Sequence, residues 1–162
     1  LSLKVASVIG RSFEFDLLAQ SHPVRPSRET LLTQIDELDA RGFTRVQAPL
    51  PRLIHMFRHS ITQEVVHDTL VEDQERELHR LVGETLEGLL PEAVERLAYH
   101  CFEGQSWPKA LNYNLQVARQ AQRGFANDIA LLSYQRALKA SAEIDADTAA
   151  EQLLIQLMSC VI

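Results

Sequence analysis

Apolar residues in the first 60 positions form short amphipathic segments that are separated by glycine and proline. The run over residues 1–9 ends at Gly10, which predicts a short buried helix. Asp16 is expected to cap a second short helix, and Ser27 a third helix that spans residues 28–41. The apolar positions of this third helix recur on one face: Leu31, Ile35 and Leu38.

The apolar pattern changes after Gly42. Apolar positions flank a proline-rich turn at residues 48–52, which predicts a β-hairpin of two short strands. Three short helices followed by such a hairpin is the layout of a winged helix. We therefore expect a winged-helix module, with a small β-hairpin, over residues 1–72.

Helical periodicity dominates the remainder of the chain. Residues 60–63 form a capping-box pattern that predicts a helix beginning at Ser60 and running to about Val71. Asp73 is expected to cap the next helix, and Pro91 to be the first residue of the one after it. The residues expected to face inward in the helix from Ser60 are Ile61, Val65 and Val66.

Two more helices are predicted, from Trp107 to about Gly124 and from Asn127 or Asp128 onward, with a last segment from Asp147. In repeat proteins, small alanines that face aromatic residues allow paired antiparallel helices to pack closely. We expect residues 73–162 to form the beginning of a tetratricopeptide-like array. The expected fold class is therefore mainly α.

Composition narrows the function classes. The chain has 162 residues, and its hydrophobic fraction of 46% is that of a globular domain. Its net charge of −6 counts against a dedicated nucleic-acid binder, which usually has a basic surface. Residues 1–60 carry eight Lys/Arg and six acids (net +2), and residues 61–162 carry eight and sixteen (net −8). This asymmetry indicates either two surfaces for different partners or simply different solvated helix faces.

Two cysteines, Cys101 and Cys160, cannot form a disulfide framework, which favours a reducing compartment. No run approaches the length of apolar residues that a membrane span needs. We expect a cytoplasmic protein without a membrane partner. The chain begins at Leu1 and ends at Ile162, each inside an apolar pattern, so we interpret it as a segment of a longer protein.

Sequence motifs for catalysis and metal binding are missing. There is no G-x-x-x-x-G-K-[ST], C-x-x-C or H-E-x-x-H motif, and no nucleophile elbow accompanies the serines near His59 and Asp68. The spacing of His55, His59 and His67 matches no standard metal site. We expect no catalytic residue, no metal and no enzymatic activity in this segment.

The pair Arg58-His59 is the strongest candidate for binding. It stands where a strand is predicted to end and a helix to begin. Helix N-termini attract anions through their unpaired N–H groups, and a neighbouring Arg or His adds donors to a phosphate. The alternative is that His59 only hydrogen-bonds to backbone at a domain corner.

Several segments resemble one family. Residues 57–70, FRHSITQEVVHDTL, and 76–80, RELHR, resemble the F-R-H-x-L-x-Q-E-x-x-Y-x-x-L…R-x-x-L-H-R stretch of STAND-class signal-transduction P-loop ATPases. These ATPases are fused to bacterial adenylate/guanylate cyclases or to LuxR-type regulators. The segment VIGRSF at 8–13 is similar to the opening of that region. The segments LAYH at 97–100 and WPKAL at 107–111 are similar to the start of its tetratricopeptide-like array.

The resemblance implies a regulatory role. In that class a winged helix packs on the nucleotide-binding module, and a histidine at its helix start contacts the β-phosphate. His59 matches the histidine of the Met-His-Asp motif of related ATPases, with Ser60 in place of Asp, and Arg58 is the second candidate. The longer protein would bind ATP or ADP with Mg. The implied partners are its adjacent nucleotide-binding domain and a protein on the helical repeat.

The main alternative is a winged-helix DNA-binding segment of a transcription regulator. The net charge of +2 in the first 60 residues is compatible with it, and Arg45 and Arg52 would lie on the wing. The helix over residues 28–41 would enter the groove, but it carries four acids that repel phosphate. These acids are Glu29, Asp36, Glu37 and Asp39. We therefore do not expect nucleic acid as a partner.

Overall fold

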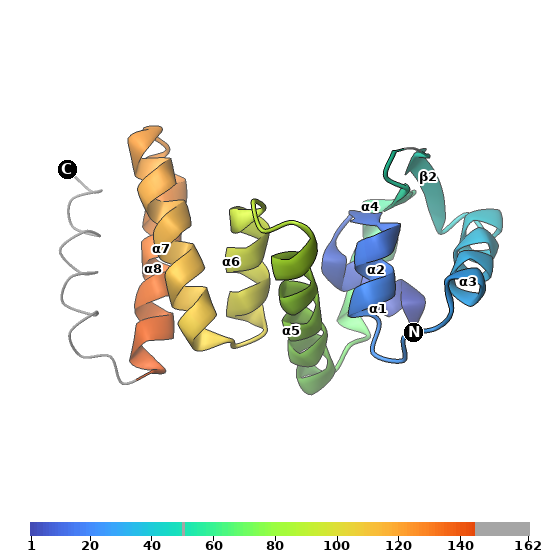
Figure 1. Ribbon diagram of the computed structural model, residues 1–162, viewed down its shortest axis with the longest axis horizontal. Helices are drawn as coiled ribbons and strands as arrows, with labels where there is room; N and C mark the ends of the chain where they lie inside the picture. Colours follow the sequence, from blue (N-terminus) through green and yellow to red (C-terminus); the bar gives the residue numbers. More distant parts are fainter. Residues whose placement is uncertain (50, 145–162) are drawn as a thin grey trace. The chain divides into compact units, whose positions relative to one another are not determined.

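The computed structural model describes residues 1–49 and 51–144, and within these ranges the chain forms eight helices and three short strands (Figure 1). The expected mainly α class is confirmed. The chain divides into two compact units, Leu1–Thr85 and a second that begins at Leu86. The helix predicted from Asp147 lies outside the described residues.

The first unit combines helices with a three-stranded antiparallel sheet. Its elements are α1 (Ser2–Ile9), β1 (Ser12–Glu14), α2 (Phe15–Ser21), α3 (Arg28–Ala40), β2 (Thr44–Ala48), β3 (Ile54–Phe57), α4 (Ser60–Asp68) and most of α5 (Glu72–Leu89). The strand order is β1-β3-β2, so β3 is central. The predicted hairpin of β2 and β3 is confirmed, with a bulge between Val46 and Ala48, and β1 is a third strand that the pattern did not predict.

Aromatic packing holds β1 onto β3. Phe13 lies opposite His55 in the register and stacks on its imidazole at 5.9 Å between ring centroids. Phe13 also meets the edge of Phe57 at 5.8 Å, and all three side chains are buried. Fully buried apolar residues of the same unit come from α1, α2 and α3: Val5, Ala6, Leu17, Leu18, Leu31 and Ile35.

The ends of α3 follow the sequence signals. Ser27 Oγ accepts a hydrogen bond from Thr30 N at 3.1 Å, which confirms the predicted cap. The helix ends at Arg41, and Gly42 then adopts a φ of 79°, a left-handed conformation that glycine tolerates best.

Two predicted caps are wrong. Asp16 lies inside the first turn of α2, which begins at Phe15, and its carboxylate instead accepts a hydrogen bond from Arg28 Nη1 at 2.8 Å. The capping box at Ser60 does not form, because Ser60 is already helical. The side-chain amide of Gln63, which the box would turn back, donates instead to Ser7 O at 2.8 Å.

The predicted inward face of α4 is wrong for Ile61 and Val65, whereas Val66 is half-buried. None of the residues of α4 is buried, and Ile61 and Val65 are 61% and 56% exposed. The contact from Gln63 to α1 is polar, and so is a second bond in which Lys4 Nζ donates to Thr69 O at 3.1 Å. Polar contacts to α1 therefore help to hold a helix that the apolar pattern had placed in the core.

The second unit is helical over its described residues. It contains the end of α5, α6 (Val94–Glu103), α7 (Trp107–Arg123) and α8 (Asn127–Ala142). The predicted starts at Trp107 and Asn127 are confirmed. Two other starts are wrong: Asp73 lies within α5, which begins at Glu72, and Pro91 lies in the turn before α6.

The helix α7 packs against both α6 and α8, and α7 and α8 run antiparallel (Figure 1). Small and aromatic residues meet in the core of this pair: Ala118, Ala130, Tyr134 and Ala137. Trp107 meets the edge of Phe102 at 5.9 Å between centroids. Alanines facing Tyr134 let the helix backbones approach closely, as the sequence pattern indicated.

The loops between α6 and α7 and between α7 and α8 each turn on a residue with a positive φ that is not glycine. Gln105 has a φ of 53° and Phe125 a φ of 57°, each directly after a glycine that ends the helix. The backbone N–H two residues after each glycine closes the helix end by bonding to a carbonyl five residues earlier. Within the described residues, no helix has both the length and the apolar character that crossing a bilayer requires.

Candidate functional site

The corner between β3 and α4 carries the two residues selected from the sequence. Arg58 is fixed to the neighbouring chain segment, because its N–H donates to Phe43 O at 3.0 Å and its Nε to Thr44 O at 3.3 Å. His59 is the N-cap residue of α4, and its carbonyl accepts from Thr62 N at 3.1 Å. Both residues are exposed.

The His59 imidazole does not cap the helix that it precedes, since it forms no capping hydrogen bond with the N–H groups of α4. An exposed imidazole and an exposed guanidinium therefore stand next to a helix N-terminus. This is an arrangement that can bind a phosphate or carboxylate.

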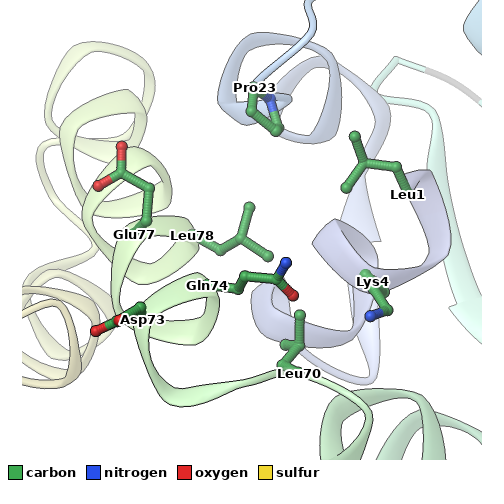
Figure 2. A pocket seen from close by; sticks show the side chains of 8 residues that line it. All are labelled: Leu1, Lys4, Pro23, Leu70, Asp73, Gln74, Glu77 and Leu78. Carbon is green, nitrogen blue, oxygen red and sulfur yellow. The ribbon is translucent and has the colours of Figure 1, made fainter.

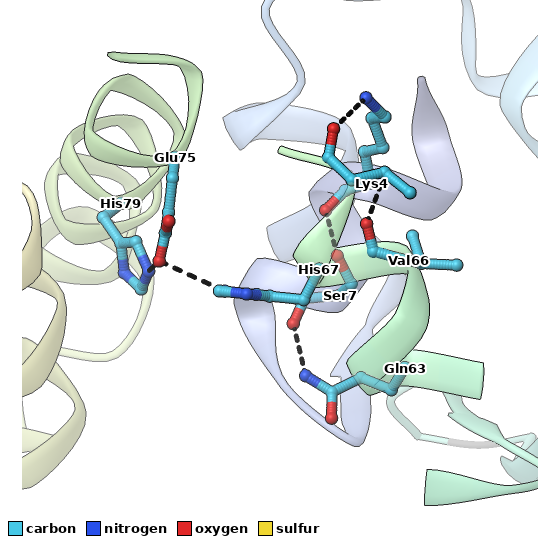
Figure 3. Close-up of polar contacts among 8 residues, drawn as sticks. Lys4, Ser7, Gln63, Val66, His67, Glu75 and His79 are labelled. Atoms are coloured by element: carbon cyan, nitrogen blue, oxygen red, sulfur yellow. Dashed lines mark hydrogen bonds and ion pairs between the residues drawn. The ribbon is translucent and has the colours of Figure 1, made fainter. Parts of the chain in front are cut away.

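A second group of chemically active side chains lies at the other end of α4. His67, in its last turn, has Nε2 at 3.6 Å from Glu75 Oε1, and His79 Nε2 lies 4.0 Å from the same oxygen. Figure 3 shows the His67 imidazole directed at the Glu75 carboxylate, with His79 beside it. The donor atoms of the three residues lie within 4.8 Å of one another.

Burial differs across this cluster. The side chain of His79 is fully buried, whereas those of His67 and Glu75 are 26% and 37% exposed. Burial, together with the nearby His67, lowers the pKa of His79 from 6.5 to about 4. The His79 imidazole is therefore neutral at neutral pH.

Sequence reasoning missed this cluster. Glu75 and His79 are four residues apart, a spacing that places them on one face of a helix, and this signal was available. His67 joins them only because α4 ends at Asp68 and the chain turns over three residues into α5. The three histidines considered from the sequence lie in different settings: His55 on β3, His59 before α4 and His67 near its end.

The buried His55 belongs to a structural group. Its Nδ1 lies 3.5 Å from Asp39 Oδ2, and Thr44 Oγ1 donates to the other carboxylate oxygen of Asp39. Asp39 comes from the last turn of α3, so the group links this helix to β2 and β3. It fixes the sheet and offers no exposed surface at His55.

A pocket of about 600 Å³ opens in the first unit. Figure 2 shows leucine and proline side chains lining it, with charged residues of α1 and α5 around them. Its lining residues are Leu1, Lys4, Pro23, Leu70, Asp73, Gln74, Glu77 and Leu78. Neither Arg58 nor His59 is among them, so the pocket and the predicted phosphate-binding corner are separate features.

Comparison with known proteins does not assign a family. No protein-family model, no curated protein and no solved structure matches this chain. Function must therefore be argued from the residues and their geometry.

Proposed function

We propose that this chain is a non-catalytic regulatory segment of a multidomain STAND-class signalling ATPase. It couples the nucleotide state of an adjacent P-loop domain to a nucleotide-cyclase or transcription output. The observation that carries the proposal is the exposed Arg58-His59 pair at the N-terminus of α4, with an imidazole that the helix does not use as a cap. Such a pair is placed to read a phosphate that another domain presents.

The first unit has the element order of a winged helix. The order is helix, strand, two helices, and then a hairpin whose second strand joins the first strand of the unit. This order supports a winged-helix module, in which β2 and β3 form the wing. A sensor needs its binding residues held in a fixed position. The hydrogen bonds from Arg58 to the carbonyls of Phe43 and Thr44 hold the corner between β3 and α4 in this way.

The second unit is proposed to bind a protein partner as a tetratricopeptide-like element. Its helices α7 and α8 form a tight antiparallel pair, and apolar side chains remain on their surface. Phe125 is 89% exposed, and Ile129 and Leu132 are about half exposed. Exposed apolar groups on a helical repeat are typical of a protein-interaction surface.

The test uses the full-length protein that contains this segment. The variant His59→Asn keeps a good N-cap residue while removing the imidazole, and Arg119→Gln removes an exposed cation from α7 as a matched control. A charge-assisted hydrogen bond is worth about 1.5–3 kcal/mol, so loss of His59 should weaken ADP or ATP retention about 10–100-fold. The output activity should change with it.

The readouts are the nucleotide that co-purifies with the protein, its release rate, and the cyclase or transcription output. The control variant should match the wild type in bound nucleotide and in release rate. Unchanged retention and unchanged regulation in His59→Asn would contradict the sensor role.

DNA binding is the alternative outcome. Three acids of α3 are exposed, Glu29, Asp36 and Glu37, and they would face phosphate if this helix entered a groove. Asp39 is engaged with Thr44 and His55 instead. A salt-dependent mobility shift of DNA by this chain at moderate ionic strength would favour the DNA-binding role over the regulatory one.

A further inference from the structure

We propose that His67, Glu75 and His79 form a binding site for one divalent transition-metal ion of the zinc class. The site would connect the end of α4 to the first turns of α5. It is separate from the corner at His59 and stands or falls independently of the proposed nucleotide sensing.

The distances indicate a metal site better than a hydrogen-bonded group. Glu75 Oε1 lies 3.6 Å from His67 Nε2 and 4.0 Å from His79 Nε2, and both distances exceed those of side-chain hydrogen bonds. Zinc bonds of about 2.1 Å in a tetrahedral arrangement place neighbouring donor atoms roughly 3.4 Å apart. All three donor atoms already lie within 4.8 Å of one another, so binding needs movements of less than about 1 Å per atom.

The donor set selects the metal. Two imidazole nitrogens and one carboxylate oxygen suit Zn²⁺, Co²⁺ or Ni²⁺, whereas Mg²⁺ and Ca²⁺ prefer sites made wholly of oxygen. His₂Glu is a known three-residue zinc ligand set that leaves a fourth position for water or another ligand. The partial exposure of His67 and Glu75 provides the path for an ion to enter and room for this fourth ligand.

The neighbouring charges keep the Glu75 carboxylate available. Arg76 follows it in the sequence, but its guanidinium bonds to Glu72 Oε1 at 2.9 Å and to Asp73 Oδ1 at 3.3 Å. These two pairs direct the cation to the preceding turn of α5. The carboxylate of Glu75 faces the two histidines instead (Figure 3).

The position of the site explains what an ion would do. The helix α4 has no buried residue, and Lys4 and Gln63 make polar bonds that tie its region to α1. A metal bound by His67 and by two residues of α5 would hold the C-terminal end of α4. The ion would thus stabilise the one helix of the first unit that lacks buried side chains.

The test is a titration of the untagged chain with ZnCl₂ after removal of metals by a chelator. Isothermal calorimetry should show one equivalent bound, and Co²⁺ should give the intense visible absorption of a four-coordinate site. Loss of even an outer-sphere partner costs about 10–100-fold in metal affinity, so Glu75→Gln or His67→Asn should weaken binding at least 100-fold. Both residues are partly exposed, which makes these variants better suited than a change at buried His79.

His59→Asn is the matched control, because it removes an exposed histidine of the same helix region without touching the cluster. Its Zn²⁺ affinity should equal that of the wild type. In the wild type and in this control Zn²⁺ should raise the Tm, and in His67→Asn it should not. Absence of stoichiometric binding, wild-type Zn²⁺ affinity in either cluster variant, or preference for Mg²⁺ over Zn²⁺ would each overturn the proposal.

Discussion

Acidification should destabilise the first unit through the buried His79. Burial and the neighbouring His67 hold the pKa of this histidine at about 4 in the folded chain, whereas an exposed histidine titrates near 6.5. Between these two values the unfolded chain binds a proton that the folded chain excludes. The free energy of unfolding therefore falls as the pH drops through 6.5, and the loss is complete only below pH 4.

The size of the effect follows from this interval. A difference from 6.5 to about 4, at about 1.4 kcal/mol per pH unit, gives a total loss of about 3.5 kcal/mol once the pH lies below 4. The carboxylate of Glu75, with Oε1 at 4.0 Å from His79 Nε2, acts in the opposite direction by favouring the proton, but burial outweighs it. A loss of this size is a large part of the 5–15 kcal/mol that stabilises an ordinary domain.

Urea unfolding followed by far-ultraviolet circular dichroism at pH 7, 6, 5 and 4, with EDTA present, measures this loss. The variant His79→Gln is the reference. It lacks the titrating imidazole, while the carboxylates of the chain are the same as in the wild type. The stability of the wild type relative to the variant should fall by about 3 kcal/mol between pH 6.5 and 4. A stability difference that stays constant over this range, or an NMR titration of His79 with a midpoint near 6.5, would show that burial does not lower the pKa of His79 in the folded chain.

Three smaller predictions concern helix ends and loops, and each is measured as a change in the free energy of unfolding in urea. Ser27→Ala removes the acceptor for Thr30 N and should cost about 1 kcal/mol, whereas Ser27→Asp should retain most of the stability. Gly42→Ala should cost about 1–2 kcal/mol from its φ of 79° alone, since an added Cβ meets nothing within 4 Å; a neutral result would contradict the backbone argument. Phe125→Gly should leave stability unchanged or raise it by up to about 1 kcal/mol, because the φ of 57° strains a phenylalanine that is 89% exposed; a clear loss would show that its side chain stabilises the fold.

Local signals in the sequence were sufficient where an element is amphipathic and ends on a clear residue. The third helix was predicted from the spacing of Leu31 and Ile35 and from the cap at Ser27, and both signals act within the helix itself. The hairpin was predicted from apolar positions on either side of a proline-rich turn. These features depend on neighbours in the sequence.

Features that depend on distant residues were missed. β1 is only three residues long, and it becomes a strand because it pairs with β3 some 40 positions later. The exposed Ile61 and Val65 follow a helical apolar pattern, yet Gln63 turns the polar side of α4 toward α1 by bonding to Ser7. A period alone cannot distinguish a helix that packs by polar bonds from one that packs by apolar burial.

The candidate sites divide in the same way. Arg58 and His59 were found because a strand-to-helix boundary is visible in the sequence, and the structure places them at such a boundary. The cluster of His67, Glu75 and His79 was missed because its first member approaches the others only through the turn between α4 and α5. To predict that a histidine contacts residues on the far side of a turn, one must know the direction in which the turn sends the chain.

The packing of Trp107 against Phe102 gives the second unit an optical signal of its own. Trp107 is the single tryptophan, and the three tyrosines, at 99, 113 and 134, also lie after Leu86. The aromatic residues of the first unit, apart from histidine, are phenylalanines. Intrinsic fluorescence therefore reports on the second unit alone, while circular dichroism reports on both. Comparing the two signals during one denaturation shows whether the units unfold together or in sequence, without any added label.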